Sequence, residues 1–213
     1  MEYYPFEDKY TVAAPSSAVS ADYMNVFYAG LPNAITISAA GVAPTNLVAK
    51  INGNTAPLIP AGNGKYTIKP ITTGTCDVVV YSREANGQLK AQGPPVKFRV
   101  KPIPTPFVKV NGKYTLGTHE MKRIELNALS AISADIPGFD LSAKFKIKTY
   151  KVVTLADGLI NENRCDGFNL SASAKAAISK VKAGGRVFLE DIIAIGPDGK
   201  EIPLNNVTIR IKS

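Results

Sequence analysis

Short segments in which apolar and polar residues alternate constrain the fold of this chain more than any other feature. Such alternation places apolar side chains on one face of a β-strand, as at Tyr66 and Ile68. Asn-Gly pairs at 52–53, 63–64 and 86–87 fit tight hairpins, because both residue types tolerate a positive φ. Strands at this spacing predict an immunoglobulin-like β-sandwich over residues 22–103. The candidate strands of this part are Ile35–Ser38, Leu47–Ile51, Lys65–Lys69, Val78–Ser82 and Val96–Val100.

The second half of the chain alternates as well, but it adds two segments with helical spacing. Thr118 is expected to cap a short helix that ends at Asn127, with Met121, Ile124 and Ala128 on one face. A clearer helix starts at Ser171 or Ser173 and ends before Gly184-Gly185. Residues 104–213 are therefore predicted to form a β-rich domain with two short inserted helices. Its candidate strands are Phe107–Val110, Tyr114–Leu116, Ala143–Thr149, Ile192–Ile195 and Val207–Lys212, with hairpin turns at Asn111-Gly112 and Asp198-Gly199.

Three prolines at alternate positions, Pro102, Pro104 and Pro106, separate the two halves. Proline fixes φ near about −65° and has no backbone N–H, so a central strand does not run through them. The prolines are predicted to form a semi-rigid interdomain connector close to polyproline II. The chain of 213 residues is thus predicted to be mainly β, with two domains in tandem.

The sequence lacks the residue groups that catalysis and metal binding require. His119, the only histidine, is expected in the first turn of a helix, and Glu190-Asp191 is expected in a strand where neighbours face opposite sides. Cys76 is expected to be buried and Cys165 to be exposed in a polar loop. No Cys/His cluster or calcium loop is present in the sequence. We therefore expect no enzyme, no metal and no cofactor.

The net charge is +8, and it is spread along the chain. Lys and Arg are not concentrated among aromatic residues, so no nucleic-acid partner is expected. Four lysines around one predicted strand are the exception: Lys144, Lys146, Lys148 and Lys151. Two interpretations fit them. Lysines on the wet face of a strand discourage edge pairing, and the same lysines could form a docking site for an acidic partner.

Several segments together resemble the GldM/PorM family, and its PorM branch most. Ala14–Gly30, with its Val-Ser-Ala-Asp-Tyr-Met-Asn-Val stretch, resembles the entry to the family's third periplasmic domain. Phe98–Pro106 resembles the connector to the fourth domain. Phe139–Ile147 and Val187–Lys200 resemble core strands of the fourth domain. Residues 1–21 would then be the end of the preceding domain or a linker.

The resemblance implies a periplasmic part of a type IX secretion and gliding-motility subunit. Family members are anchored in the inner membrane by an N-terminal helix, which this sequence would lack, and form homodimers. They act with an inner-membrane motor partner of the PorL/GldL type and reach outer-membrane-associated ring proteins of the PorK/PorN or GldK/GldN type. The apolar start Tyr3–Phe6 is a candidate for exchange between two copies. The alternative hypothesis is an adhesin or surface-binding module of tandem immunoglobulin-like domains.

Overall fold

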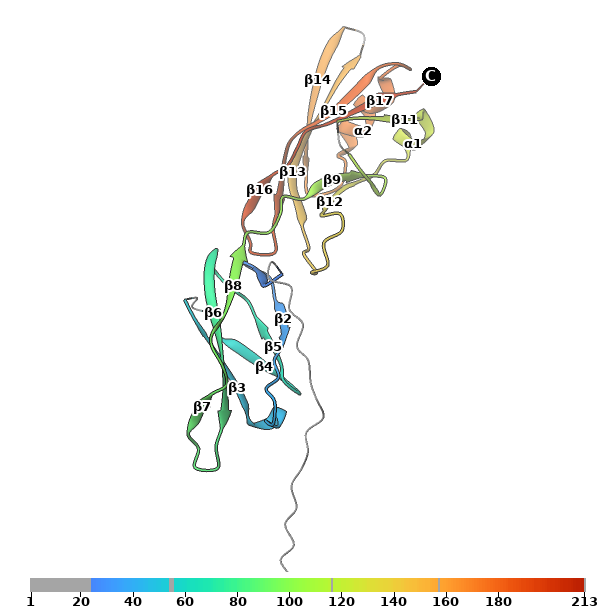
Figure 1. Ribbon diagram of the computed structural model, residues 1–213. Helices are drawn as coiled ribbons and strands as arrows, with labels where there is room; N and C mark the ends of the chain where they lie inside the picture. Colours follow the sequence, from blue (N-terminus) through green and yellow to red (C-terminus); the bar gives the residue numbers. More distant parts are fainter. Residues whose placement is uncertain (1–23, 54–55, 116, 157, 213) are drawn as a thin grey trace, which may run out of the picture. The chain divides into compact units, whose positions relative to one another are not determined.

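The computed structural model describes residues 24–53, 56–115, 117–156 and 158–212. The chain forms two compact units. Of the described residues, the first unit contains those up to Tyr28 together with those from Pro32 to Lys101, and the second contains Ala29–Leu31 together with those from Pro102 onward. Both consist mainly of β-strands in sandwich-like sheets, and the second contains two short α-helices (Figure 1). The predicted fold class is confirmed, whereas independent folding of 22–103 and 104–213 stays a prediction.

Two sheets form the first unit. One has five strands in the order β1-β8-β6-β3, with β7 beside β6, and the other has the order β2-β5-β4. β1 runs parallel to β8, and the other pairs are antiparallel. The elements are β1 (Val26–Tyr28), β2 (Asn33–Thr36), the 3-10 turn η1 (Pro44–Asn46), β3 (Leu47–Asn52), β4 (Leu58–Gly62), β5 (Lys65–Ile68), β6 (Gly74–Arg83), β7 (Leu89–Ala91) and β8 (Val96–Lys101).

The Asn63-Gly64 turn joins β4 to β5 as the sequence predicts. Asn63 has φ +51° and Gly64 has φ +72°, so both central residues lie in the left-handed region that this kind of turn requires. A Cβ on Gly64 would lie 2.5 Å from the Ile37 carbonyl oxygen. Glycine is therefore required at this position both for its backbone angle and for the space that it leaves.

Polar side chains connect the two sheets of the first unit through its core. The Tyr66 hydroxyl on β5 donates a hydrogen bond of 3.0 Å to the Leu47 carbonyl on β3. The buried Asn33 side chain on β2 accepts from the Tyr28 N–H at 2.8 Å and donates to the Tyr28 carbonyl at 2.9 Å. Phe27 on β1 stacks on Phe98 of β8 with ring centroids 4.3 Å apart.

The second unit contains a three-stranded sheet in the order β10-β9-β12 and a six-stranded sheet. We call the latter the large sheet; its order is β11-β17-β15-β13-β14, with β16 beside β15. Among the described strands of this unit, β11 and β17 pair in parallel and the other pairs are antiparallel. The elements are β9 (Phe107–Val110), β10 (Lys113–Tyr114), β11 (Thr118–Met121), α1 (Arg123–Asn127), β12 (Ile132–Asp135), β13 (Lys146–Ala156), β14 (Leu159–Asp166), α2 (Ala172–Lys180), β15 (Arg186–Ile195), β16 (Glu201–Pro203) and β17 (Val207–Ile211).

One face of the large sheet forms the main core of the second unit. Its alternate residues are fully buried, including Val152 on β13, Leu189 on β15 and Ile209 on β17. The helix α2 packs against β13 and β14, and α1 packs against α2. Residues of the small sheet, such as Val108 and Ile132, belong to the same core. The opposite face of the large sheet, which we call its outer face, carries the charged residues of these strands.

The start of α2 follows its predicted cap, whereas the helix ends at Lys180, earlier than the predicted stop at Gly184-Gly185. Ser171 is the N-cap, and its hydroxyl accepts a hydrogen bond of 3.2 Å from the Ala174 N–H. At the other end, the Arg123 guanidinium donates to the carbonyls of Ile178 and Val181. These bonds fix α1 against the end of α2.

The predicted first helix is wrong at its start. Thr118–Met121 is the strand β11, which pairs with β17, so Thr118 caps no helix and His119 lies in a strand. The helix starts after Lys122, whose N–H donates to the Glu125 carboxylate at 2.8 Å. Ile124, expected on the buried face, is 75% exposed.

Candidate partner-binding surface

The four predicted lysines lie on or just before β13, and all four are exposed. Lys146 and Lys148 lie on either side of the buried Ile147 along the strand. Lys151 lies between the buried Tyr150 and Val152. Simple alternation would turn Lys151 away from the other two, but the pairing of β13 with β15 shifts register between Ile147 and Lys151. This irregularity returns Lys151 to the outer face.

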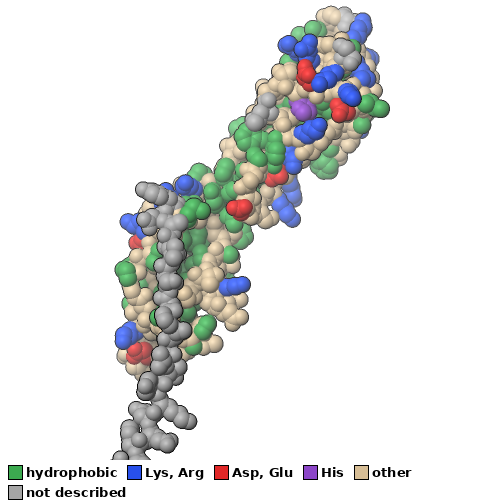
Figure 2. Space-filling model, turned by 45° about the vertical axis from the view of Figure 1, so that its right-hand side comes forward, with side chains coloured by type: hydrophobic (Ala, Val, Ile, Leu, Met, Phe, Trp, Pro, Cys, Tyr) green, Lys and Arg blue, Asp and Glu red, His purple; other side chains and the backbone are tan. Residues whose placement is uncertain are grey.

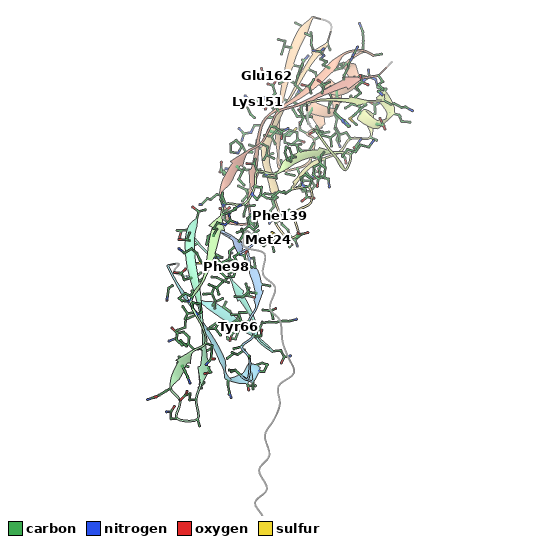
Figure 3. All side chains as sticks on the ribbon, viewed as in Figure 1. Met24, Tyr66, Phe98, Phe139, Lys151 and Glu162 are labelled. Atoms are coloured by element: carbon green, nitrogen blue, oxygen red, sulfur yellow. The ribbon has the colours of Figure 1, made fainter. Side chains whose placement is uncertain are left out.

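Two of these lysines already face carboxylates of the neighbouring strands. Lys148 forms an ion pair with Glu201 of β16, and the Lys151 ammonium lies 2.8 Å from the Asp191 carboxylate of β15. The hydrogen bond to Asp191 is the largest cause of a raised pKa at Lys151, and the charges of Glu162 and Glu190 add to it. Figure 3 labels Lys151 and Glu162. These side chains are about half exposed, so the pairs contribute little to stability.

Asp191 owes its position to a bulge in β15. It has φ +50°, a left-handed conformation that Asp tolerates better than most residues. Glu190 and Asp191 lie in a strand as expected, but the left-handed conformation of Asp191 interrupts the regular alternation on which their opposite facing was based.

The position of β13 within the sheet bears on the two interpretations at Lys151 alone, and both stay open for Lys144, Lys146 and Lys148. From Thr149 to Ala156 the strand pairs with β14 on one side, and with β15 on the other over most of this length. It is an interior strand there, so Lys151 protects no edge. Of the four lysines, Lys144 and Lys146 form no ion pair among the described residues. Any attraction of an acidic partner would depend mainly on these two.

Figure 2 shows Lys and Arg side chains interspersed with Asp and Glu on the face of the molecule that it draws. The described residues contain no group of three or more His, Cys, Asp or Glu that could hold a metal ion. No described helix is long and apolar enough to cross a membrane.

The predicted connector has no regular secondary structure between the end of β8 and the start of β9. Pro102 and Pro104 are exposed, whereas Pro106 is buried. No peptide bond is cis in the described part of the chain. The role of these prolines as a semi-rigid spacer stays a prediction.

Both cysteines are buried and free. Cys76 fits its prediction, and burial raises the pKa of its thiol. The prediction for Cys165 is wrong: it lies on β14 opposite Tyr150, and its sulfur accepts a hydrogen bond from the Ser171 N–H at 3.3 Å. The polar neighbours of Cys165 in the sequence suggested a loop, but they belong to a strand at the edge of the sheet.

The sequence analysis missed an exposed apolar group at the β13–β14 hairpin. Leu155, Leu159 and Ile160 are 57%, 69% and 70% exposed. Three large apolar side chains next to an Asp-Gly turn were the available signal. They mark this end of the large sheet as a surface that another chain could cover.

Two β-sandwich units in series, with charged and apolar surfaces but no described metal cluster, define a tandem β-module protein. Residues 16–101 match the family described as GldM third domain, and residues 102–212 match GldM C-terminal domain. The chain therefore belongs to the GldM family, as the resemblance indicated, and is a component of type IX secretion and gliding motility. These domains fit a periplasmic part of a membrane-anchored protein.

Other comparisons add little. No curated protein matches the chain. Fibronectin(III)-like modules of Clostridium thermocellum CbhA are 17% identical, cover 88% of this chain and 89% of their own, and give a TM-score of 0.27. A Ca2+-stabilized adhesin that helps an Antarctic bacterium to bind ice is 16% identical to this chain. The match covers 88% of this chain and 46% of the adhesin chain, with a TM-score of 0.28. The extracellular cadherin domains of protocadherin gamma B2 are 7% identical to this chain. The match covers 86% of this chain and 40% of the protocadherin chain, with a TM-score of 0.21. Similarity this low carries no argument about function.

Proposed function

We propose that this chain is a non-enzymatic periplasmic link of a type IX secretion system. In this role it connects an inner-membrane motor to a ring associated with the outer membrane, and it transmits conformational change between them. The observation that carries the proposal is the match of both units, in order, to the third and C-terminal domains of GldM. The same match favours this role over that of an adhesin.

The two units suit a mechanical role because each has its own means of resisting deformation. Hydrogen bonds from Tyr66 and Asn33 connect the sheets of the first unit, and a continuous apolar core supports the large sheet of the second. A connector containing three prolines has fewer accessible conformations than a flexible linker of the same length. We propose that this restriction allows movement of one unit to reach the other.

Ring binding is assigned to the second unit within this proposal. Lys144 and Lys146 would contribute through electrostatic attraction, because neither is neutralised by a described carboxylate. Charges at the rim of an interface mainly change the association rate and its salt dependence. The motor partner would be reached through a part of the protein that precedes this sequence, and the protein would act as a homodimer.

A pull-down from periplasmic extract tests the proposal. The 213-residue chain is immobilised, and bound proteins are identified by mass spectrometry. The proposal predicts capture of ring proteins of the type IX system, with weaker capture when K144E and K146E are combined. Capture of glycans or host surface proteins, without ring proteins, would support the adhesin hypothesis instead.

A further inference from the structure

The strand β14 is the longest edge strand among the described residues. Its eight residues, Leu159–Asp166, pair with β13 and with no other described strand, and this pairing has no register shift. The opposite edge of the large sheet, β11, has four residues. In the first unit, the edge strand β3 has six residues, and β4 contains Pro60 and a register shift. Figure 1 shows no further strand beyond β14. A long, regular edge without proline is a template for pairing with another strand.

The hydrogen-bond pattern shows which backbone groups of β14 face outward. The Gly167 N–H donates to the Lys148 carbonyl at 2.7 Å, in the same register as the β13–β14 pairs. Hydrogen-bonded pairs alternate along an antiparallel ladder, so the odd-numbered residues of β14 bond to β13. The N–H and C=O groups of the even-numbered residues therefore point away from the sheet, and these residues are Ile160, Glu162, Arg164 and Asp166.

The side chains of the same even-numbered residues form an exposed row on the outer face of the large sheet. The row starts with Ile160, which is 70% exposed, and continues with a negative, a positive and a negative residue. Arg164 lies 3.0 Å from Asp166 of its own strand, and both side chains are more than two-thirds exposed. Glu162 is exposed and forms no ion pair within the described part of the chain. The edge thus presents free backbone groups beside a fixed order of charges.

The order of charges restricts which strand fits this edge. Charges of one sign protect an edge because they repel most strands, whereas alternating signs repel only strands whose charges are in the wrong order. An antiparallel strand places one of its residues directly opposite each residue of the row, and opposite charges in such pairs are favourable. The strand that fits therefore has a basic residue opposite Asp166, an acidic residue opposite Arg164, a basic residue opposite Glu162 and an apolar residue opposite Ile160.

We propose that the edge of β14 binds an extended segment of another protein, which adds to the large sheet as an antiparallel strand. From its N-terminus, the segment carries a basic, an acidic, a basic and an apolar side chain at alternate positions. Hydrogen bonds to the outward N–H and C=O groups supply the affinity, and the charges set the register. The apolar side chain covers Ile160. This proposal does not depend on the role in secretion.

Two synthetic peptides, blocked at both ends, test the order of charges on the 213-residue chain. The peptide TKTETKTVT has the proposed pattern, and the peptide TETKTETVT has the charges exchanged. Calorimetry should show that the first binds at least about tenfold more tightly. The net charge of +8 attracts the second peptide more, so non-specific attraction does not produce this preference. The triple variant E162K/R164E/D166K should reverse the preference, whereas the control E120K on β11, at the opposite edge, should leave it unchanged.

Amide hydrogen exchange, resolved by NMR, tests the addition of a strand. The even-numbered amides of β14 should exchange quickly in the free chain and become protected when TKTETKTVT binds, whereas the odd-numbered amides should be protected in both states. R164P removes one outward N–H and no bond to β13, so the chain should fold but lose the peptide. R164Q keeps this N–H and should bind more tightly than R164P.

Three results would overturn the proposal. The first is no binding of TKTETKTVT at about 1 mM, and the second is equal affinity for the two peptides. The third is protection of the even-numbered amides in the free chain, because the edge would then already be covered.

Discussion

The two units are built from the same kind of strand, but they stabilise their sheets in different ways. In the first unit, the buried Asn33 and Tyr66 form hydrogen bonds from one sheet to the other. In the second, the core is a single apolar cluster on one face of the large sheet, and the helices complete it. The first unit should therefore depend strongly on a few polar contacts, and the second on the volume of its apolar side chains.

The largest expected effect is in the second unit. Ile209 is fully buried on β17 between β11 and β15, so I209A should lower the free energy of unfolding by about 2–5 kcal/mol. Denaturant unfolding of the 213-residue chain should show the loss in the transition of the second unit. The matched control I124A removes a side chain that is 75% exposed and should change little. An equal loss in both variants would contradict the assignment of the core.

The polar contacts of the first unit give the next effect. N33A removes the buried amide that bonds to both the N–H and the C=O of the partly buried Tyr28, and should cost about 1–3 kcal/mol. Y66F removes one hydrogen bond, to Leu47, and should cost about 0.5–1.5 kcal/mol. Both losses should appear in the transition of the first unit alone. If I209A shifts this transition as much as N33A does, the two units do not unfold separately.

Ser171 offers a smaller test within the second unit. S171A removes the acceptor for the Ala174 N–H and should cost about 1 kcal/mol. The Ser171 N–H that bonds to Cys165 remains, whereas the contacts of the Ser171 hydroxyl with the Cys165 sulfur and the Ser173 hydroxyl are lost together with the cap. The control S179A changes a serine near the end of α2 and should not destabilise the unit. Equal destabilisation in the two variants would show that the cap is unimportant.

The smallest effects on stability are expected from the lysines of the outer face. K148E and K151E each replace an exposed ion pair by a repulsive contact, and each should lower the melting temperature only slightly. K144E and K146E should leave stability unchanged but reduce the salt dependence of ring binding. Unchanged binding in the K144E/K146E double variant would contradict the electrostatic part of the proposal.

The sequence predicts the elements whose determinants are local. Alternation and Asn-Gly turns are enough for β5 and its hairpin, because Asn63 and Gly64 both take the required positive φ. Ser171 starts α2 for the same reason, since a cap acts on adjacent backbone groups.

The errors arise where distant residues decide the structure. Thr118–Met121 has helical spacing, yet it forms a strand because β17, about ninety residues later, is available to pair with it. Cys165 lies among polar residues, but Ser171 and the face that α2 covers bury it. Alternation alone also fails for Lys151, because its direction depends on the register shift between Ile147 and Thr149 in the pairing of β13 with β15.

The connector between the two units tests the central claim, that the chain transmits conformational change through a restricted linkage. Replacing Pro102, Pro104 and Pro106 together by Ser should leave the melting of each unit nearly unchanged, because the change lies outside the strands. Control melts and protein levels in cells verify this point. The decisive measurement is type IX secretion of cargo in cells that carry the triple variant. We predict impaired secretion with normal levels of the protein, and normal secretion would contradict a mechanical role for this chain.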